Sequence, residues 1–273
     1  RLAIAEIRFE GNEAFTDEEL REAMQTRQEG FFWFRQGRFD RNTFQQDLLQ
    51  RLPEFYGAHG YIDFTVVSDT LEIDPVSGKA RLTITVDEGE QYRLGEFAVQ
   101  GAQYFPTQQL EQMFVTQSRS VLGLPFGSDR RQRGQIFDQA ALADATVRVQ
   151  QLYRNNGYLA AQVEPIIQRT RGPDGEPVVD VTWQIREGSP FFINRVIIEG
   201  NTYTHESVIR DQLVVLPGDL YSDDRLIQSY RSLSALGFFE TPLPEPDIIP
   251  DLLSGTVDVV FRVKEKQTGS INF

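Results

Sequence analysis

The side chains best able to do chemistry are few in this chain. It has no cysteine, which excludes disulfides, thiolate metal sites and cysteine nucleophiles. Its two histidines, His59 and His205, stand 146 positions apart. The acidic run Asp17-Glu18-Glu19 could suggest a metal site, but acidic residues are expected in the first turn of a helix. The sequence holds no HExxH, P-loop or GxGxxG motif. We therefore expect no metal, no cofactor and no enzyme activity, with a hydrolase assembled from distant residues as the alternative of another class.

Two groups of residues could instead contact a partner. The aromatic run Phe31-Phe32-Trp33-Phe34 could meet a binding partner or a neighbouring domain, or it could pack under its own loop. The second group is a cluster of arginines. It could contact lipid headgroups or an acidic partner, or it could lie in a solvated loop. It comprises Arg119, Arg130, Arg131 and Arg133. His59 lies at a predicted helix end, where a histidine favours the helix dipole and is more often a cap than a pH switch.

Composition limits the class of protein. Of 273 residues, 40% are apolar and 25% are charged, as in an ordinary globular chain. The net charge of −13 makes the chain a poor nucleic-acid binder, because phosphate binding needs a basic surface. No stretch approaches the roughly 18 to 20 apolar residues of a membrane helix, so we expect a soluble fragment. The chain begins at Arg1 without a signal segment, which suggests a piece of a longer protein.

The elements that must position these residues occur three times. Each repeat opens with a short strand that ends at a glycine, which is Gly11, Gly101 or Gly200. A glycine followed by an aromatic residue comes later, at Gly60, Gly157 and Gly237, and a strand of alternating apolar residues closes each repeat. The glycine and the Glu after that strand (Glu88, Glu187 or Glu265) are 28, 30 and 28 positions apart. Such near-constant spacing indicates three copies of one module.

Between the opening strand and the second glycine the pattern becomes helical. Thr16 to Glu19 reads as a capping box, and Thr107 and Thr204 occupy the matching N-cap positions. Leu20 and Met24, then Leu110 and Phe114, then Val208 and Leu213 are predicted to form the buried stripes of the first helices. A second helix follows in each repeat, and a turn-rich segment joins the last two strands into a hairpin.

The predicted fold is α+β, with three tandem β-α-α-β-β modules and two helices on one face of each sheet. We place module 1 at residues 1–91, module 2 at 92–190 and module 3 at 191–266. Residues 267–273 are predicted to start the junction to a further C-terminal region of the protein.

A module of this length with these glycines resembles the POTRA (polypeptide-transport-associated) domain. The segments IRFEGN, VIIEGN and YGAHGY, together with the tail VKEKQTGSINF, resemble the third to fifth POTRA domains of the assembly factors that build the outer membrane of Gram-negative bacteria. The resemblance implies a three-stranded mixed sheet in each module, with the second strand at an edge. It also implies a periplasmic scaffold that receives unfolded outer-membrane proteins, docks accessory lipoproteins, and is attached to its own C-terminal membrane β-barrel, absent from this chain.

An edge strand can bind an extended client, meaning an unfolded outer-membrane protein, by adding it as a further strand. The three edge strands are predicted at Asp63–Leu71, Ala161–Ile167 and Thr241–Ile249. The second contains Pro165 and the third contains Pro242, Pro244 and Pro246, which lack the N–H donor. Module 1 is therefore the predicted client site. Its site residues are Asp63, Phe64, Thr65, Val66, Val67, Ser68 and Asp69.

Module 3 departs from the family pattern at one position. The last POTRA domain of the family often has an acidic residue before the glycine that ends its first helix, on the face toward a lipoprotein. Here that position is Pro217, whereas the nearby Arg210 matches the basic character of the helix and is a candidate partner contact. A related barrel transporter of the translocation-module or two-partner-secretion type is the alternative within the same broad class.

Overall fold

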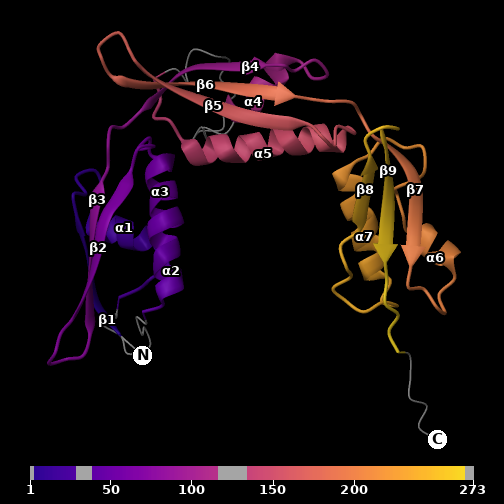
Figure 1. Cartoon of the computed structure of the whole chain (residues 1–273), viewed down its shortest axis with the longest axis horizontal. Helices are drawn as coiled ribbons and strands as arrows, with labels where there is room; N and C mark the ends of the chain where they lie inside the picture. The colour runs from indigo at the N-terminus through magenta and orange to yellow at the C-terminus, as the bar shows by residue number, and fades with distance from the viewer. Residues whose placement is uncertain (1–2, 29–38, 116–133, 268–273) are drawn as a thin grey trace, which may run out of the picture. The chain divides into compact units, whose positions relative to one another are not determined.

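The computed structural model describes residues 3–28, 39–115 and 134–267. Its elements follow the predicted order of strand, helices and hairpin in each repeat (Figure 1). Module 1 comprises β1 (Ile4–Glu10), α1 (Asp17–Ala23), α2 (Arg41–Gln46), η1 (Asp47–Arg51), α3 (Leu52–Ala58), β2 (Thr65–Ile73) and β3 (Ala80–Asp87). Module 2 comprises β4 (Arg93–Gln100), α4 (Thr107–Val115), α5 (Gln139–Asn155), β5 (Gln162–Arg171) and β6 (Pro177–Arg186). Module 3 comprises β7 (Phe192–Glu199), α6 (Glu206–Arg210), α7 (Asp223–Ala235), β8 (Asp247–Asp251) and β9 (Thr256–Arg262).

Each module holds one three-stranded sheet, with the orders β1-β3-β2, β4-β6-β5 and β7-β9-β8. The closing strand is central. In modules 1 and 3 it pairs in parallel with the first strand and antiparallel with the second. The predicted α+β class and the mixed three-stranded sheets are confirmed. The second strand of each sheet lies at an edge.

The alternating residues of the closing strands form the cores. In β3, Leu82, Ile84 and Val86 are buried and pack with Leu20 and the other apolar residues of the helices. In β9, Val257, Val259 and Phe261 are buried in the same way, against α6 and α7. Burial of one face of each strand therefore places the helices on that face of the sheet.

Steric hindrance explains why a glycine follows each opening strand. Gly11, Gly101 and Gly200 all have φ between +86° and +94°. A Cβ on them would lie 2.2, 2.1 and 2.0 Å from the carbonyl oxygens of Val86, Ile185 and Val263 respectively. Only a residue without a side chain lets the first strand turn away so close to the closing strand.

The helix starts differ from the prediction in two modules. The capping box of Thr16 and Glu19 is present, but α4 begins at Thr107 itself and α6 is capped at His205. Because α6 starts later than predicted, the residue that faces the core is Ile209, which is fully buried, whereas Val208 is 37% exposed.

The second helix of module 1 contains a π-helical turn that the sequence did not predict. This turn, η1, places the carboxylate of Asp47 inside the module. It accepts hydrogen bonds from the backbone N–H groups of Gln25 and Thr26 at 2.7 and 2.8 Å, and from Arg51 at 2.9 Å. Asp47 therefore fastens the chain after α1 to the second helix.

The chain divides into two compact units. The first consists of the described residues of Arg1–Ala98, Glu111–Ala145 and Pro165–Thr182, and the second of those of Val99–Leu110, Thr146–Glu164 and Trp183–Phe273. Module 2 contributes to both units. In the second unit, Arg154 at the end of α5 pairs with Asp223 at the start of α7 at 2.5 Å. No helix within the described ranges is long and apolar enough to cross a lipid bilayer.

Candidate functional site

The outer edge of β1 is closed by side chains of its own module. The N–H of Ile7 donates to Gln28 Oε1 at 3.2 Å, and the N–H of Phe9 donates to Asp17 Oδ2 at 3.2 Å. The carbonyl of Ile7 accepts a hydrogen bond from Arg21 at 3.1 Å. Since these groups already have partners, this edge is not free to pair with another strand.

The first strands of the other two modules are closed by backbone. In module 2, the N–H of Leu94 donates to Gln135 and its carbonyl accepts from Gly134, both at 2.8 Å. In module 3, the N–H of Ile193 donates to Asp219 at 2.8 Å and its carbonyl accepts from Gly218 at 2.7 Å. The open edges must therefore be sought on the second strands, β2, β5 and β8.

Two hydrogen bonds show which residues of β2 point their N–H and C=O groups away from the sheet. Asp74 N–H donates across the hairpin to Lys79 at 2.9 Å, whereas Ala80 N–H donates to Ala3 on the other side of β3 at 2.8 Å. Because these directions alternate along a strand, Asp69, Leu71 and Ile73 point their N–H and C=O groups away from the sheet. Among residues 3–28, 39–115 and 134–267, no group bonds to this edge. The edge of β2 is thus open over its last five residues.

A β-bulge lies near the start of β2. Val66 is opposite Val86 and Ser68 is opposite Thr85, which leaves Val67 as the extra residue. The extra residue keeps Val66 and Leu71 on the same face of the sheet, where both pack against the core. Val67 is 63% exposed. The bulge was not predicted, since Val66 and Val67 are equally apolar and alternation alone does not distinguish them.

Prolines interrupt the rows of outward donors on β5 and β8. On β5, the N–H of Val163 is bonded to Gln150 Oε1 at 3.1 Å, and Pro165, two residues on, has no N–H. On β8, Pro250 is opposite Val257 and cannot donate, so its position and that of Ile248 face outward. Pro246 lies just before the strand. Because backbone directions alternate, its position faces outward as those of Ile248 and Pro250 do. Of these three positions, only Ile248 offers a donor, so β8 is a poor template for strand addition.

The predicted client-binding residues do not all lie on the edge strand. Thr65, Val66, Val67, Ser68 and Asp69 lie on β2, which begins at Thr65. Asp63 and Phe64 lie before it, so the predicted edge was placed two residues too early. Phe64 is buried, with its ring stacked on Tyr56 at 4.0 Å between centroids. It belongs to the core and is not presented at the edge.

Asp63 contacts module 2. Its carboxylate pairs with Arg169 at 2.6 Å and accepts a hydrogen bond from Tyr92 Oη at 2.9 Å. The hydrogen bond from Arg169 lowers the pKa of Asp63. Partial burial opposes this shift, and the hydrogen bond from Tyr92 adds to it. Glu90 and Arg171 form a second pair at 2.8 Å in the same unit. The start of β2 therefore lies beside an ionic contact to the end of β5.

The candidate partner contacts are only partly described. Phe31, Phe32, Trp33, Phe34, Arg119, Arg130, Arg131 and Arg133 lie outside the described residues. Arg210 is described, and it bonds within its own module, to Glu206 at 2.5 Å and to the carbonyl of Val196 at 3.1 Å. The guanidinium thus adds to the closure of the β7 edge. His59 is the C-cap of α3, as its sequence position suggested.

The acidic residues bring no metal-ligand set together. In the part of the chain that the structure describes, no group of three His, Asp or Glu side chains could hold a metal ion. Glu19 belongs to the capping box, where its carboxylate accepts from the N–H of Thr16 at 2.8 Å.

One set of repeated residues was missed as a functional feature. Glu88, Glu187 and Glu265 each bind backbone N–H groups just after the opening strand of their own module. Glu265 accepts from the N–H groups of Thr202, Tyr203 and Thr204. We call this contact the glutamate clamp. The constant spacing marked these residues in the sequence, but spacing alone does not reveal a bond to a distant backbone.

The glutamate clamp makes stability depend on pH. Burial opposes ionisation of Glu187, but the bonds from Tyr153 Oη and from the N–H groups of Tyr104 and Gln103 outweigh it and lower its pKa below the ordinary value of 4.5. A lowered folded-state pKa contributes stability that is present above the unfolded value and lost as pH falls through the folded value. We expect hydrogen exchange at the Tyr104 amide to be slower in the native chain than in Glu187→Gln at pH 7, with the difference shrinking below about pH 4. A difference that stays constant down to pH 3 would contradict this account.

Comparison with known proteins identifies the module. The POTRA family model, described as surface antigen variable number repeat, matches residues 2–89, 92–188 and 191–266. The chain belongs to the POTRA family. Three POTRA domains follow one another along it, and the sheet edges described above are those of POTRA domains.

The relatives come from outer-membrane assembly. The chain is 26% identical over 278 residues to the outer membrane protein assembly factor BamA of Neisseria meningitidis serogroup B, an alignment that covers 98% of this chain and 32% of that protein. It is 24% identical over 276 residues to BamA of Nitratidesulfovibrio vulgaris, with 99% and 32% covered. The chain thus spans about a third of the length of these curated relatives.

A solved structure shares the fold. POTRA domains 3–5 of Haemophilus influenzae BamA match with a TM-score of 0.71 and 24% identity, over 97% of this chain and 96% of that one. At this identity the match shows a shared fold, and it agrees with the predicted similarity to the third to fifth domains of an assembly factor.

Proposed function

We propose that this chain is the periplasmic scaffold of an outer-membrane protein assembly machine and that it holds unfolded clients on the edge of β2. The observation that carries the proposal is the open edge of β2, which contains no proline, whereas prolines interrupt the edges of β5 and β8. The similarity to BamA relatives supports the assembly role. In this proposal the POTRA domains are attached to an outer-membrane β-barrel and also dock accessory lipoproteins.

The chemistry of β2 suits clients of many sequences. An added strand bonds to the outward N–H and C=O groups of Asp69, Leu71 and Ile73, which any polypeptide can pair with. Leu71 and Ile73 stand on the helix-side face, opposite Leu82 and Ala80, and provide apolar contact to alternate side chains of the client. Main-chain pairing gives affinity without demanding a sequence, and the apolar face adds a mild preference. No covalent chemistry is part of this function.

A proline at one outward position tests the proposal. Asp69→Pro removes one outward donor and leaves the ladder to β3 intact, because Ser68 and Thr70 make the inward bonds. We expect an unfolded outer-membrane strand peptide to bind about tenfold more weakly, from the loss of one hydrogen bond and its geometry. The measurement is the titration of amide signals of β2 by NMR.

The matched control is Asp69→Ala, which removes the same carboxylate but keeps the N–H. It should bind the peptide as the native chain does. If the proline and alanine variants bind equally well, or if no amide of β2 responds at millimolar peptide, strand addition at β2 is wrong.

A further inference from the structure

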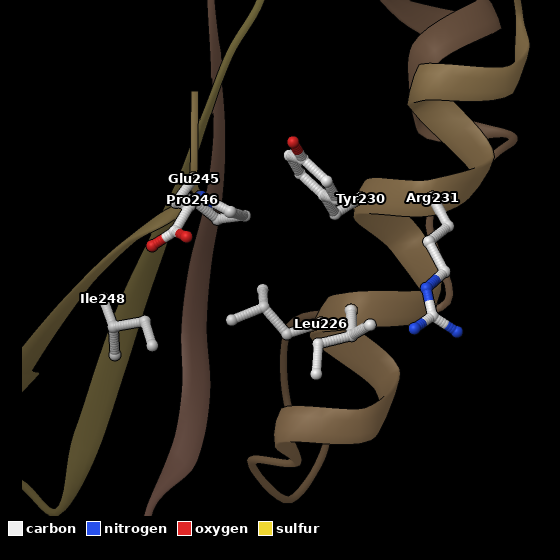
Figure 2. A pocket seen from close by; sticks show the side chains of 7 residues that line it. Leu226, Tyr230, Arg231, Glu245, Pro246 and Ile248 are labelled. Carbon is white, nitrogen blue, oxygen red and sulfur yellow. The ribbon is translucent and has the colours of Figure 1, made fainter. Parts of the chain in front are cut away.

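Module 3 has a groove between its second helix and its edge strand (Figure 2). The cavity has a volume of about 440 Å³. Leu226, Ile227 and Tyr230 come from α7, and Pro246 and Ile248 from β8 and the segment before it. Ile227 is 46% exposed although it is apolar. The walls of the groove are therefore apolar and reachable from solvent.

Two charged side chains line this groove. Arg231 belongs to α7 and Glu245 to the strand side (Figure 2). Both are exposed, and neither forms an ion pair with any other described residue. By contrast, Arg225 and Arg262 of the same module are paired, with Asp219 and with Asp247. An unpaired cation and an unpaired anion beside an apolar cavity match a ligand that carries both charges around an apolar centre.

The strand side of the groove limits how a ligand can bind. Pro246 and Pro250 leave the N–H of Ile248 as the single outward donor among the three outward positions from 246 to 250. A fourth strand would find donors missing on both sides of Ile248. A ligand in this groove must therefore be held by its side chains, in contrast to one on β2.

We propose that this groove binds an extended protein segment by one large apolar side chain that enters between α7 and β8, with an acidic residue placed near Arg231 and a basic residue near Glu245. This site goes beyond the proposed strand addition at β2, because it lies in another module and does not use main-chain pairing. In an extended segment, residues two positions apart share a face, so the ligand is expected to read Lys-x-Phe-x-Glu or its reverse.

The test uses the whole chain and a seven-residue peptide with a central Phe, with Lys and Glu two positions to either side. A second peptide carries N-methyl groups on alternate residues, which removes the donors needed for strand addition. We expect both peptides to shift amide signals of α7 and β8 with affinities equal within about twofold, and a peptide with Ser at the centre to bind at least about tenfold more weakly.

Variants place the peptide in the groove. Ile227→Glu should weaken binding about tenfold or more. Ile249→Glu, at a 53% exposed position on the other face of β8, should leave it unchanged. The native chain should prefer the peptide with one Lys and one Glu around the Phe. Arg231→Glu should instead prefer a peptide with Lys on both sides of the Phe, whichever direction the peptide takes.

Several outcomes would overturn the proposal. The proposal is wrong if the amide signals of α7 and β8 do not respond at millimolar peptide, or if N-methylation abolishes binding. It is also wrong if the two isoleucine variants weaken binding equally, or if Arg231→Glu leaves the charge preference unchanged. Binding at β2 is judged separately, because it should be abolished by N-methylation and weakened by Asp69→Pro, and neither should affect the groove.

Discussion

Gly11→Ala is expected to destabilise module 1 by about 4 kcal/mol or more, which is among the largest effects of a single methyl group. Two causes add together. The backbone at Gly11 has φ +87°, which alone costs a residue with a side chain about 1 kcal/mol. The new Cβ would also lie 2.2 Å from the Val86 carbonyl oxygen, so the first and closing strands must separate. The measurement is urea unfolding followed by amide signals of module 1.

Gly78→Ala is the matched control for this prediction. Gly78 lies in the β2–β3 turn with φ +66°, and a Cβ there would have no atom within 4 Å. It should cost about 1 kcal/mol, the conformational part alone. Equal losses in the two variants would show that the close approach of the strands does not matter. Because β2 is held by β3, Gly11→Ala should also weaken client binding at β2.

Asp47→Ala is expected to cost module 1 about 3 to 5 kcal/mol. The carboxylate of Asp47 is fully buried. Its loss leaves the N–H groups of Gln25 and Thr26 without an acceptor and removes the ion-pair partner of Arg51. A buried donor that loses its partner retains the full cost of its desolvation. The free energy of unfolding of module 1, measured by urea titration, gives the effect.

Asp40→Ala provides the comparison. Asp40 is the N-cap of α2, and its exposed carboxylate accepts from the N–H of Thr43 at 2.9 Å. Its removal should cost only about 1 kcal/mol, as for other helix caps. If Asp47→Ala were no more harmful than Asp40→Ala, the π-helical turn would have no structural role beyond that of an ordinary helix cap.

The repeated pattern of strands and helices was predictable because each element has a local signal. Period-two alternation marks Leu82, Ile84 and Val86 as one face of a strand, and burial in the core follows from that alone. The capping box at Thr16 is a contact over three residues, so the sequence contains both partners. The mixed three-stranded sheets were implied by the family resemblance and not by these signals.

The features that were missed depend on contacts between distant residues. The exposure of Val208 depends on where α6 starts, and the sequence favoured Thr204 over His205 as the cap. Asp63 was assigned to the edge because it precedes apolar residues, but Arg169, 106 positions away, holds it. The groove of module 3 was not predicted either, since it forms only when α7 and the segment before β8 come together.

The glutamate clamps also set the order in which the modules can form. Each clamp joins the segment after the opening strand to a glutamate just beyond the closing strand, across 75 positions for Glu88, 84 for Glu187 and 63 for Glu265. A chain that arrives in its compartment with the N-terminus first cannot close a module until that glutamate has arrived too. No later module is needed for this contact, so each module can close before most of the next has arrived. The unpaired edge of β2 can therefore form while the third module is still being delivered.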